Sequence, residues 1–262
     1  MTRLVAPNPG IFTGPGTNTY LVGRSSLIVV DPGPDIPNHL DAIVDLGAGR
    51  IRQIVVTHTH PDHAPGARGL AARTGAEVVG FGPSDGFVPD RVVLDGDLVI
   101  PGEFALKAIH TPGHASNHLC WLLESEGLLF AGDHVMEGST VVINPPDGDM
   151  SAYMTSLELV RNLDPSLRAI APGHGALIGN PGMLLDWYLA HRYEREARVL
   201  DALSTAGSSS AAALVPAVYA DVDESLHEAA RLSLWAHLIK LQREGRASST
   251  SAGDPEGIWE AL

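Results

Sequence analysis

Three histidines and one aspartate lie within six consecutive positions of this chain, at His58, His60, Asp62 and His63. They follow an apolar run, residues 54–56, that has the composition of a buried strand. Imidazole nitrogens and carboxylate oxygens suit zinc and other first-row metal ions, and such groups left unpaired beside a core strand would cost desolvation energy. The cluster therefore predicts a metal centre.

Three later segments have the same character. Each follows an apolar run, contains glycine and carries a residue that can bind a metal, at residues 111–114, 131–134 and 172–175. Glycine lets the backbone bend sharply after a strand, so side chains from several strand ends can point to one place. We therefore expect four strand ends to supply ligands to one site.

The order of these residues resembles that of the dinuclear hydrolases of metallo-β-lactamase fold. The H-x-H-x-D-H motif stands at residues 58–63, and single histidine, aspartate and histidine residues follow it in the same order, over a match that covers residues 1 to 180. The resemblance implies two zinc ions, with iron or manganese in one position as an alternative. It also implies that one metal is held by His58, His60 and His114, that the second is held by Asp62, His63 and His174, and that Asp133 bridges the two.

Two metals held in this way would give the chain a hydrolytic chemistry. A hydroxide that bridges them would be a nucleophile at neutral pH, because metal coordination lowers the pKa of water from about 15.7 to about 7 even with one zinc. One metal would polarise the oxygen of the electrophile and the other would stabilise the leaving group, while the family position of Asp62 suits a proton carrier. We predict a hydrolase that cleaves an ester, thioester or lactone bond of a small-molecule substrate.

Other substrates stay open. Residues 237–246 are similar to the last helix and turn of a winged-helix module, and together with residues 190–198 they resemble the C-terminal segment of the beta-lactamase-like protein 2 subgroup, whose members cut single-stranded RNA. A hydroxyacylglutathione hydrolase is a further alternative, whereas a true beta-lactamase is disfavoured because zinc beta-lactamases generally lack the bridging aspartate that Asp133 would supply. The weakest alternative is a non-enzymatic metal-binding protein, because structural zinc sites are usually rich in cysteine and Cys120 is the only thiol.

The charge of the chain argues against a surface built for many phosphate contacts. The net charge is −14, and from residue 207 onward four basic residues stand against eight acidic ones, a net charge of −4. Nucleic-acid binding is driven by lysine and arginine side chains that displace counterions. We expect the C-terminal module to act as a lid or dimer element at the mouth of the site, with RNA docking and a homodimer as the alternatives.

The remaining histidines fall into two groups. His118 lies close in sequence to the ligands and is predicted to contact the substrate, with His110 and His134 as weaker candidates for supporting roles. The other four have no ligand-like context and are expected to be packed or solvated: His39, His191, His227 and His237. Residues 14–20 form either the rim of the site or a plain turn into the first sheet.

Strand-like and helix-like segments alternate along most of the chain, which is 44% hydrophobic and 18% charged, as in ordinary globular proteins. Strands are expected near residues 19–22, 27–30, 54–56, 78–79, 98–100, 106–109, 119–123, 128–130 and 169–171, and helices near 38–46, 66–73 and 150–163. The pattern predicts an α/β protein, and the resemblance implies a four-layer αββα arrangement with the site at one edge of the sheets.

The character of the sequence changes after residue 179. Helical periodicity is expected over residues 184–203, 211–219 and 226–241, so we predict a catalytic domain at residues 1–180 and a helical, winged-helix-like C-terminal domain at residues 181–262. No apolar run approaches the length that spans a bilayer, and the N-terminus lacks the apolar stretch of a signal peptide. We therefore expect a cytoplasmic protein without a membrane partner.

Overall fold

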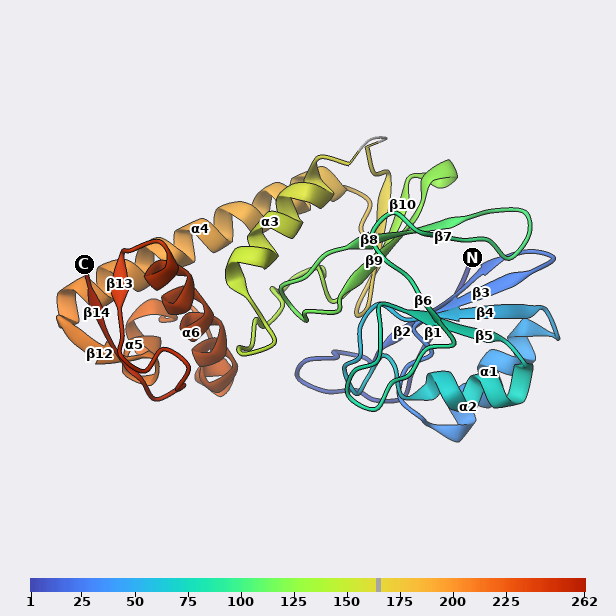
Figure 1. Ribbon diagram of the computed structural model, residues 1–262, viewed down its shortest axis with the longest axis horizontal. Helices are drawn as coiled ribbons and strands as arrows, with labels where there is room; N and C mark the ends of the chain where they lie inside the picture. The colour runs from blue at the N-terminus through green and yellow to red at the C-terminus, as the bar shows by residue number, and fades with distance from the viewer. Residues whose placement is uncertain (164–165) are drawn as a thin grey trace. The chain divides into compact units, whose positions relative to one another are not determined.

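The computed structural model describes residues 1–163 and 166–262 (Figure 1). These residues form two compact units whose segments alternate along the chain. Apart from residues 164–165, the first unit consists of residues 1–111, 117–140 and 161–184, and the second of residues 112–116, 141–160 and 185–262. Each unit is described by itself.

The first unit contains a six-stranded sheet in the order β1-β2-β3-β4-β5-β6. Neighbouring strands are antiparallel from β1 to β3 and parallel from β3 to β6. Parallel strands covered on both faces favour continuous runs of branched apolar residues, as β3 shows. The strands are β1 (Thr2–Val5), β2 (Asn18–Gly23), β3 (Leu27–Val30), β4 (Ile51–Val55), β5 (Glu77–Gly80) and β6 (Arg91–Val92).

A five-stranded sheet, also in the first unit, has the order β11-β10-β9-β8-β7. All neighbours in it are antiparallel except β10 and β11, which are parallel. The strands are β7 (Leu98–Val99), β8 (Leu106–His110), β9 (Leu119–Leu123), β10 (Leu128–Gly132) and β11 (Ala169–Pro172).

Alternating side chains build a separate core on each face of the first sheet. On β3, Ile28 and Val30 belong to a core shared with Trp121 and other residues of the second sheet. Leu27 and Val29, which point the opposite way, belong to a core shared with α1 (Pro37–Gly47) and α2 (Gly66–Thr74). The first unit therefore consists of helices, a sheet and a second sheet in successive layers, and Figure 1 shows α1 and α2 on the outer side of the first sheet.

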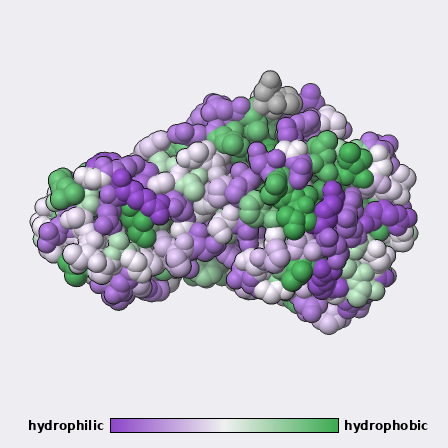
Figure 2. Space-filling model, viewed as in Figure 1, coloured by the Kyte–Doolittle hydropathy of each residue, from purple (hydrophilic) through white to green (hydrophobic). Residues whose placement is uncertain are grey.

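The apolar surface of this unit includes its short edge strands. Figure 2 shows hydrophobic side chains gathered in patches on the viewed face. Val92 of β6 and Leu98 of β7 are 51% and 48% exposed. Each edge strand has only two residues, and a short edge limits pairing with strands of another chain.

The second unit is built from helices and a small sheet. Its helices are α3 (Met150–Arg161), α4 (Pro181–Ala206), α5 (Ala211–Val218) and α6 (His227–Arg243), and its sheet has the order β12 (Ser208–Ser210), β14 (Ile258–Ala261), β13 (Ala247–Ser248). Short 3-10 turns occur at Glu124–Glu126 in the first unit and at Glu224–Leu226 in the second.

The core of the second unit joins α4, α5 and α6 to β14. Leu203, Leu214 and Leu238 are buried in it. Trp259 of β14 is fully buried in the same core, so the chain packs back on the helices after residue 253. Two helices followed by a hairpin-like wing agree with the expected winged helix. No helix among the described residues is long and apolar enough to cross a membrane.

Candidate metal centre

The ligand-type residues follow the carboxyl ends of four strands. β4 ends just before the 57–63 turn, which leads into α2, and β8 leads into residues 111–116. β10 and β11 lead to Asp133 and His174 respectively. The close approach of these two strand ends requires glycine, because a Cβ on Gly173 would lie 2.6 Å from Asp133 Oδ1.

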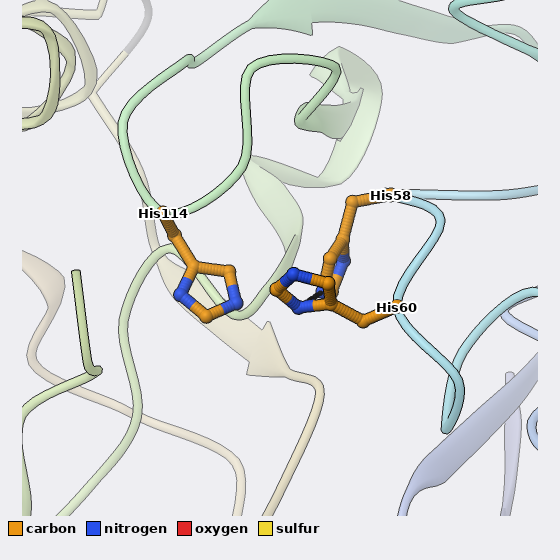
Figure 3. A group of neighbouring side chains, drawn as sticks. All are labelled: His58, His60 and His114. Atoms are coloured by element: carbon orange, nitrogen blue, oxygen red, sulfur yellow. Dashed lines mark hydrogen bonds between the residues drawn. The ribbon is translucent and has the colours of Figure 1, made fainter. Parts of the chain in front are cut away.

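The first group of donors consists of His58, His60 and His114. One ring nitrogen from each lies within 4.8 Å of the others, and Figure 3 shows the three rings turned toward one another. The Nε2 atom of His58 is 3.0 Å from Nδ1 of His60. Ligands on a tetrahedral zinc with bonds of about 2.0 to 2.1 Å are about 3.4 Å apart, so this spacing suits a shared ion.

The second group consists of Asp62, His63 and His174. His63 Nε2 lies 3.3 Å from Asp62 Oδ2 and 3.4 Å from Asp133 Oδ1. His174 Nε2 lies 3.2 Å and 3.3 Å from the same two oxygens. Because Asp133 also groups with His58 and His63, its carboxylate lies among donors of both groups, as a bridging ligand would.

Burial and charge make this cluster suited to a cation. His63 is fully buried, and its Nε2 atom faces the carboxylate oxygens of Asp62 and Asp133 without an aligned hydrogen bond among the described residues. A metal ion that accepts the Nε2 lone pair would satisfy this buried atom. The donor set, nitrogen and oxygen at ligand-to-ligand spacing, therefore fits the metals that the resemblance implies.

The pKa values of the second group reflect the same attraction. Burial lowers the pKa of His174, but the carboxylates of Asp133 and Asp62 outweigh burial and raise it to about 9. For His63, burial again lowers the pKa and the same carboxylates raise it well above its usual range. Burial raises the pKa of both carboxyls, and the neighbouring charge of His63 outweighs it and holds both pKa values low. The carboxylates of the site therefore stabilise a positive charge placed between them.

Asp31, a residue that the sequence interpretation missed, orients two of these histidines. Its buried carboxylate accepts hydrogen bonds from the backbone N–H of Thr57 at 2.7 Å, from the Thr57 hydroxyl at 2.7 Å and from Nδ1 of His63 at 2.9 Å. Since a carboxylate only accepts, Nδ1 of His63 carries the proton and Nε2 is left for a metal. The signal was present in the sequence, because Asp31 follows an apolar run and precedes Pro32 and Gly33, the same context as the other ligand segments.

The Thr57 hydroxyl extends this control to His58. Its single proton goes to Asp31, so it accepts from Nδ1 of His58, which lies 3.0 Å away. The Nε2 atom of His58 then faces the first group of donors. One buried carboxylate thus sets the tautomer of a histidine in each group.

Backbone carbonyls orient two more histidines. Nδ1 of His114 lies 2.8 Å from the carbonyl oxygen of Val142, and Nδ1 of His174 lies 3.2 Å from that of Gly16. A carbonyl only accepts, so both rings keep Nε2 for a ligand. The 14–20 loop therefore touches the site, where Thr17 also donates its hydroxyl to Oδ2 of Asp62 at 3.3 Å.

The other histidines and the cysteine lie outside the two donor groups. His118 is fully buried, pairs with the Thr111 hydroxyl at 2.9 Å and has its ring 5.0 Å from that of His58. Its substrate contact stays a prediction. His110 stacks on Phe81, and His134 is buried. Burial raises the pKa of the Cys120 thiol to about 12, which agrees with a core position. His39 and His237 are buried, and His191 and His227 are partly exposed.

Comparison with known families accounts for most of the chain. Residues 12–82 and 80–174 match the Metallo-beta-lactamase superfamily, and residues 210–259 match the Beta-lactamase associated winged helix domain. The predicted fold class, an α/β metallo-β-lactamase fold with a C-terminal winged helix, is therefore confirmed. The boundary between residues 180 and 181 stays a prediction.

Individual proteins extend the match to nearly the whole chain. The sequence is 32% identical over 275 residues to the Beta-lactamase-like protein 2 homolog of Drosophila melanogaster, covering 97% of this chain and 91% of that protein. It is 33% identical over 249 residues to an atrochrysone carboxyl ACP thioesterase of Aspergillus chevalieri, covering 88% of this chain and 76% of that protein. A metallo-beta-lactamase family protein from Thermus thermophilus has the same fold, with a TM-score of 0.81 at 22% identity over 100% of this chain and 98% of that one.

Proposed function

Because the chain belongs to the metallo-β-lactamase superfamily, a family of metal-binding hydrolases, we propose that it is a dinuclear metal-dependent hydrolase that cleaves an ester, thioester or lactone bond of a small substrate. The main support is the convergence of two donor groups on the carboxylate of Asp133. A single tetrahedral ion needs only three or four ligands, whereas seven donors lie here. Zinc is the proposed metal, with iron or manganese in one position as the alternative.

The residues would divide the work as follows. Two bound ions would supply a water of lowered pKa and a Lewis acid for the substrate oxygen. Asp31 would hold His63 and, through Thr57, His58 in the tautomers that bind a metal. One ion would be held by His58, His60 and His114 and the other by Asp62, His63 and His174, with Asp133 between them.

Asp62 is the carboxylate best placed to move a proton. Its side chain is 25% exposed, compared with 12% for Asp133, so it is the one more open to solvent and substrate. The Thr17 hydroxyl donates to Oδ2 of Asp62 and fixes the orientation of the carboxylate. In the proposed reaction Asp62 accepts a proton from the attacking water and returns it to the leaving group.

Ion pairs in the C-terminal segment argue for a small substrate over RNA. All four basic residues after residue 207 are paired with carboxylates of the second unit: Arg231 with Glu228 and Glu256, Lys240 with Glu196 and Glu244, Arg243 with Asp149, and Arg246 with Glu196 and Glu244. A side chain whose charge is already paired with a carboxylate contributes little to RNA affinity, because that affinity comes from free cations that displace counterions from the phosphates.

Among the ester, thioester and lactone bonds, the thioester is supported by the name of one similar protein. The similar protein of Aspergillus chevalieri is named as a thioesterase that acts on an acyl carrier protein substrate, and the alignment covers 88% of this chain. A thioester carbonyl would be attacked in the same way as that of an ester or lactone. A thioester of a small acyl group is therefore the first substrate to test.

The test combines metal analysis with a substrate panel. Protein reconstituted with zinc is analysed for metal content and assayed on a thioester, a lactone, a generic phosphodiester, a hydroxyacylglutathione and a single-stranded RNA. The RNA assay is repeated between about 50 and 200 mM salt, because binding through six or more phosphates would weaken by about a thousandfold or more over that range.

We expect two metals per chain, turnover of the thioester or lactone, and a shallow salt dependence of any RNA cleavage. At most one tightly bound metal after reconstitution would overturn the dinuclear proposal. Efficient metal-dependent RNA cleavage with a steep salt dependence would replace the small-substrate proposal with that of an endoribonuclease.

A further inference from the structure

Arg192 is a buried cation that pairs with no carboxylate in the described part of the chain. It lies on α4, is 2% exposed and makes no ion pair among the described residues. A buried charge that no opposite charge compensates costs several kcal/mol, so its other contacts must hold it in place. These are the ring of Tyr153, whose centroid is 5.1 Å from the guanidinium carbon, and the carbonyl oxygen of Val141, which accepts from Nη2 at 2.6 Å.

The segment that accepts this hydrogen bond also orients a proposed metal ligand, His114. Val141 is followed by Val142, whose carbonyl oxygen accepts from Nδ1 of His114 at 2.8 Å. The next residue, Ile143, is held through its N–H, which donates to the Ser233 hydroxyl of α6 at 3.1 Å. The Val142 carbonyl is thus fixed by hydrogen bonds of both neighbours to helices of the second unit.

The backbone of the His114 loop is held by the same unit. The Gly113 carbonyl accepts from the N–H of Asp149 at 2.8 Å, and the Pro112 carbonyl accepts from the Ser156 hydroxyl at 2.8 Å. Gly113 has φ +138, and a Cβ there would lie 2.3 Å from Cα of Tyr153, so the loop runs directly against α3. Because Arg192 also stacks on Tyr153, it contacts both α3, against which the loop runs, and the 141–143 segment that orients the imidazole.

We propose that Arg192 is a positioning residue for His114. By fixing the Val141 carbonyl it sets the direction of the Val142 carbonyl, which in turn sets the tautomer and rotation of the His114 ring. The proposal rests on the proposed metal site and adds to it a residue of the C-terminal helices that controls the affinity of one of the two ions. Groups that hold the second nitrogen of a ligating histidine typically change metal affinity by about 10- to 100-fold.

Arg195 offers a matched control on the same helix. It is 5% exposed, its guanidinium carbon lies 4.3 Å from the ring centroid of Tyr219, and it donates to the Val218 carbonyl and to Asp221. None of these contacts involves the His114 loop or residues 141–143. Arg192→Met and Arg195→Met therefore remove the same type of buried group, and each loses a ring and a carbonyl contact, but only one of them touches the support of His114.

The test measures zinc affinity in competition with a chromophoric chelator, for both variants and in two further backgrounds, His114→Ala and His174→Ala. We expect Arg192→Met to weaken one of the two sites about 10- to 100-fold and Arg195→Met to leave both sites as in the parent protein. The loss of zinc affinity caused by Arg192→Met should persist in the His174→Ala background. It should disappear in the His114→Ala background, because Arg192 acts on the metal site through the His114 ring.

A second readout is independent of bound metal. In metal-free protein labelled with ¹⁵N-histidine, the His114 ring should be in the Nδ1–H form in the parent and in Arg195→Met, and a mixture of tautomers in Arg192→Met. The positioning role would be overturned if Arg192→Met weakened both metal sites equally. It would also be overturned if Arg192→Met changed neither the affinity of the site that contains His114 nor the tautomer of the His114 ring. A parent protein that binds no metal would instead overturn the proposed function.

Discussion

Asp31→Asn tests how far one buried carboxylate controls the metal site. The native group accepts three hydrogen bonds, one on Oδ1 from the Thr57 N–H and two on Oδ2 from the Thr57 hydroxyl and from His63. An amide can accept on one side only, because the other side becomes a donor. In one orientation the NH2 group of the amide faces the Thr57 N–H, so that two donors oppose each other. In the other orientation the NH2 group faces Nδ1 of His63. The proton of that ring then moves to Nε2, the nitrogen that would bind the metal.

The size of the effect follows from what is lost. A hydrogen bond to a charged group contributes about 1.5 to 3 kcal/mol, which corresponds to a factor of about 10 to 150 in a binding constant. This agrees with the usual tenfold to hundredfold cost of removing such a partner of a metal ligand. We therefore expect Asp31→Asn to bind zinc about 10- to 100-fold more weakly, first at the ion held by His63.

Glu103→Gln is the control for this experiment. Glu103 also accepts two backbone N–H groups and a hydroxyl, from Arg24 and Ser25, but it lies at an exposed position that shares no hydrogen bond with the proposed ligands. Zinc affinities of both variants and of the parent are measured by competition titration. Parent-like affinity in Asp31→Asn, or an equal loss in Glu103→Gln, would refute the reasoning.

Three other changes probe the site and the core. Asp133→Ala should lose metal and activity together, whereas Asp62→Asn should keep at least one metal and lose about 10² to 10⁴ in turnover, as metal analysis and kinetics of both variants will show. Cys120, whose pKa burial raises to about 12, should resist a thiol reagent at about pH 8 in the native protein and react on denaturation; rapid native labelling would contradict this. Burial raises the pKa of Glu196, but its contacts with His237 and Lys240 of α6 outweigh burial and lower the pKa to about 2. Its contribution to stability is therefore present above about pH 4.5 and lost as the pH falls toward 2, and the unfolding free energy of metal-free Glu196→Gln should vary less over that window than that of the parent.

The sequence predicted parts of the strands that lead to the site because these strands contain short apolar runs. The expected strands at residues 27–30 and 119–123 agree with β3 and β9, and the three helices before residue 164 agree within a few residues. β1 and β6 were missed, since β1 is largely exposed and β6 has only two residues, and neither gives an apolar run.

The side chains around the candidate ligands were harder to predict than the ligands themselves. A histidine in a glycine turn after a strand has a recognisable pattern, and the fold brings the candidate ligands close to one another, while metal binding by them stays a prediction. The Val142 and Gly16 carbonyls carry no such pattern, because any residue has a carbonyl and only the fold determines where it points. Arg192 could not be found either, because its role depends on contacts with residues about 40 and 50 positions away.

The alternation of the two units along the chain limits how this protein can be taken apart or rebuilt. Residues 112–116 and 141–160 belong with the helices after residue 184, although they are encoded between segments of the sheet-bearing unit. A chain that stopped at residue 184 would keep these pieces but lose Arg192, Ser233 and Arg243, to which they are hydrogen bonded. The winged helix is therefore no detachable appendage, and grafting one from a relative would require exchanging the inserted segments with it.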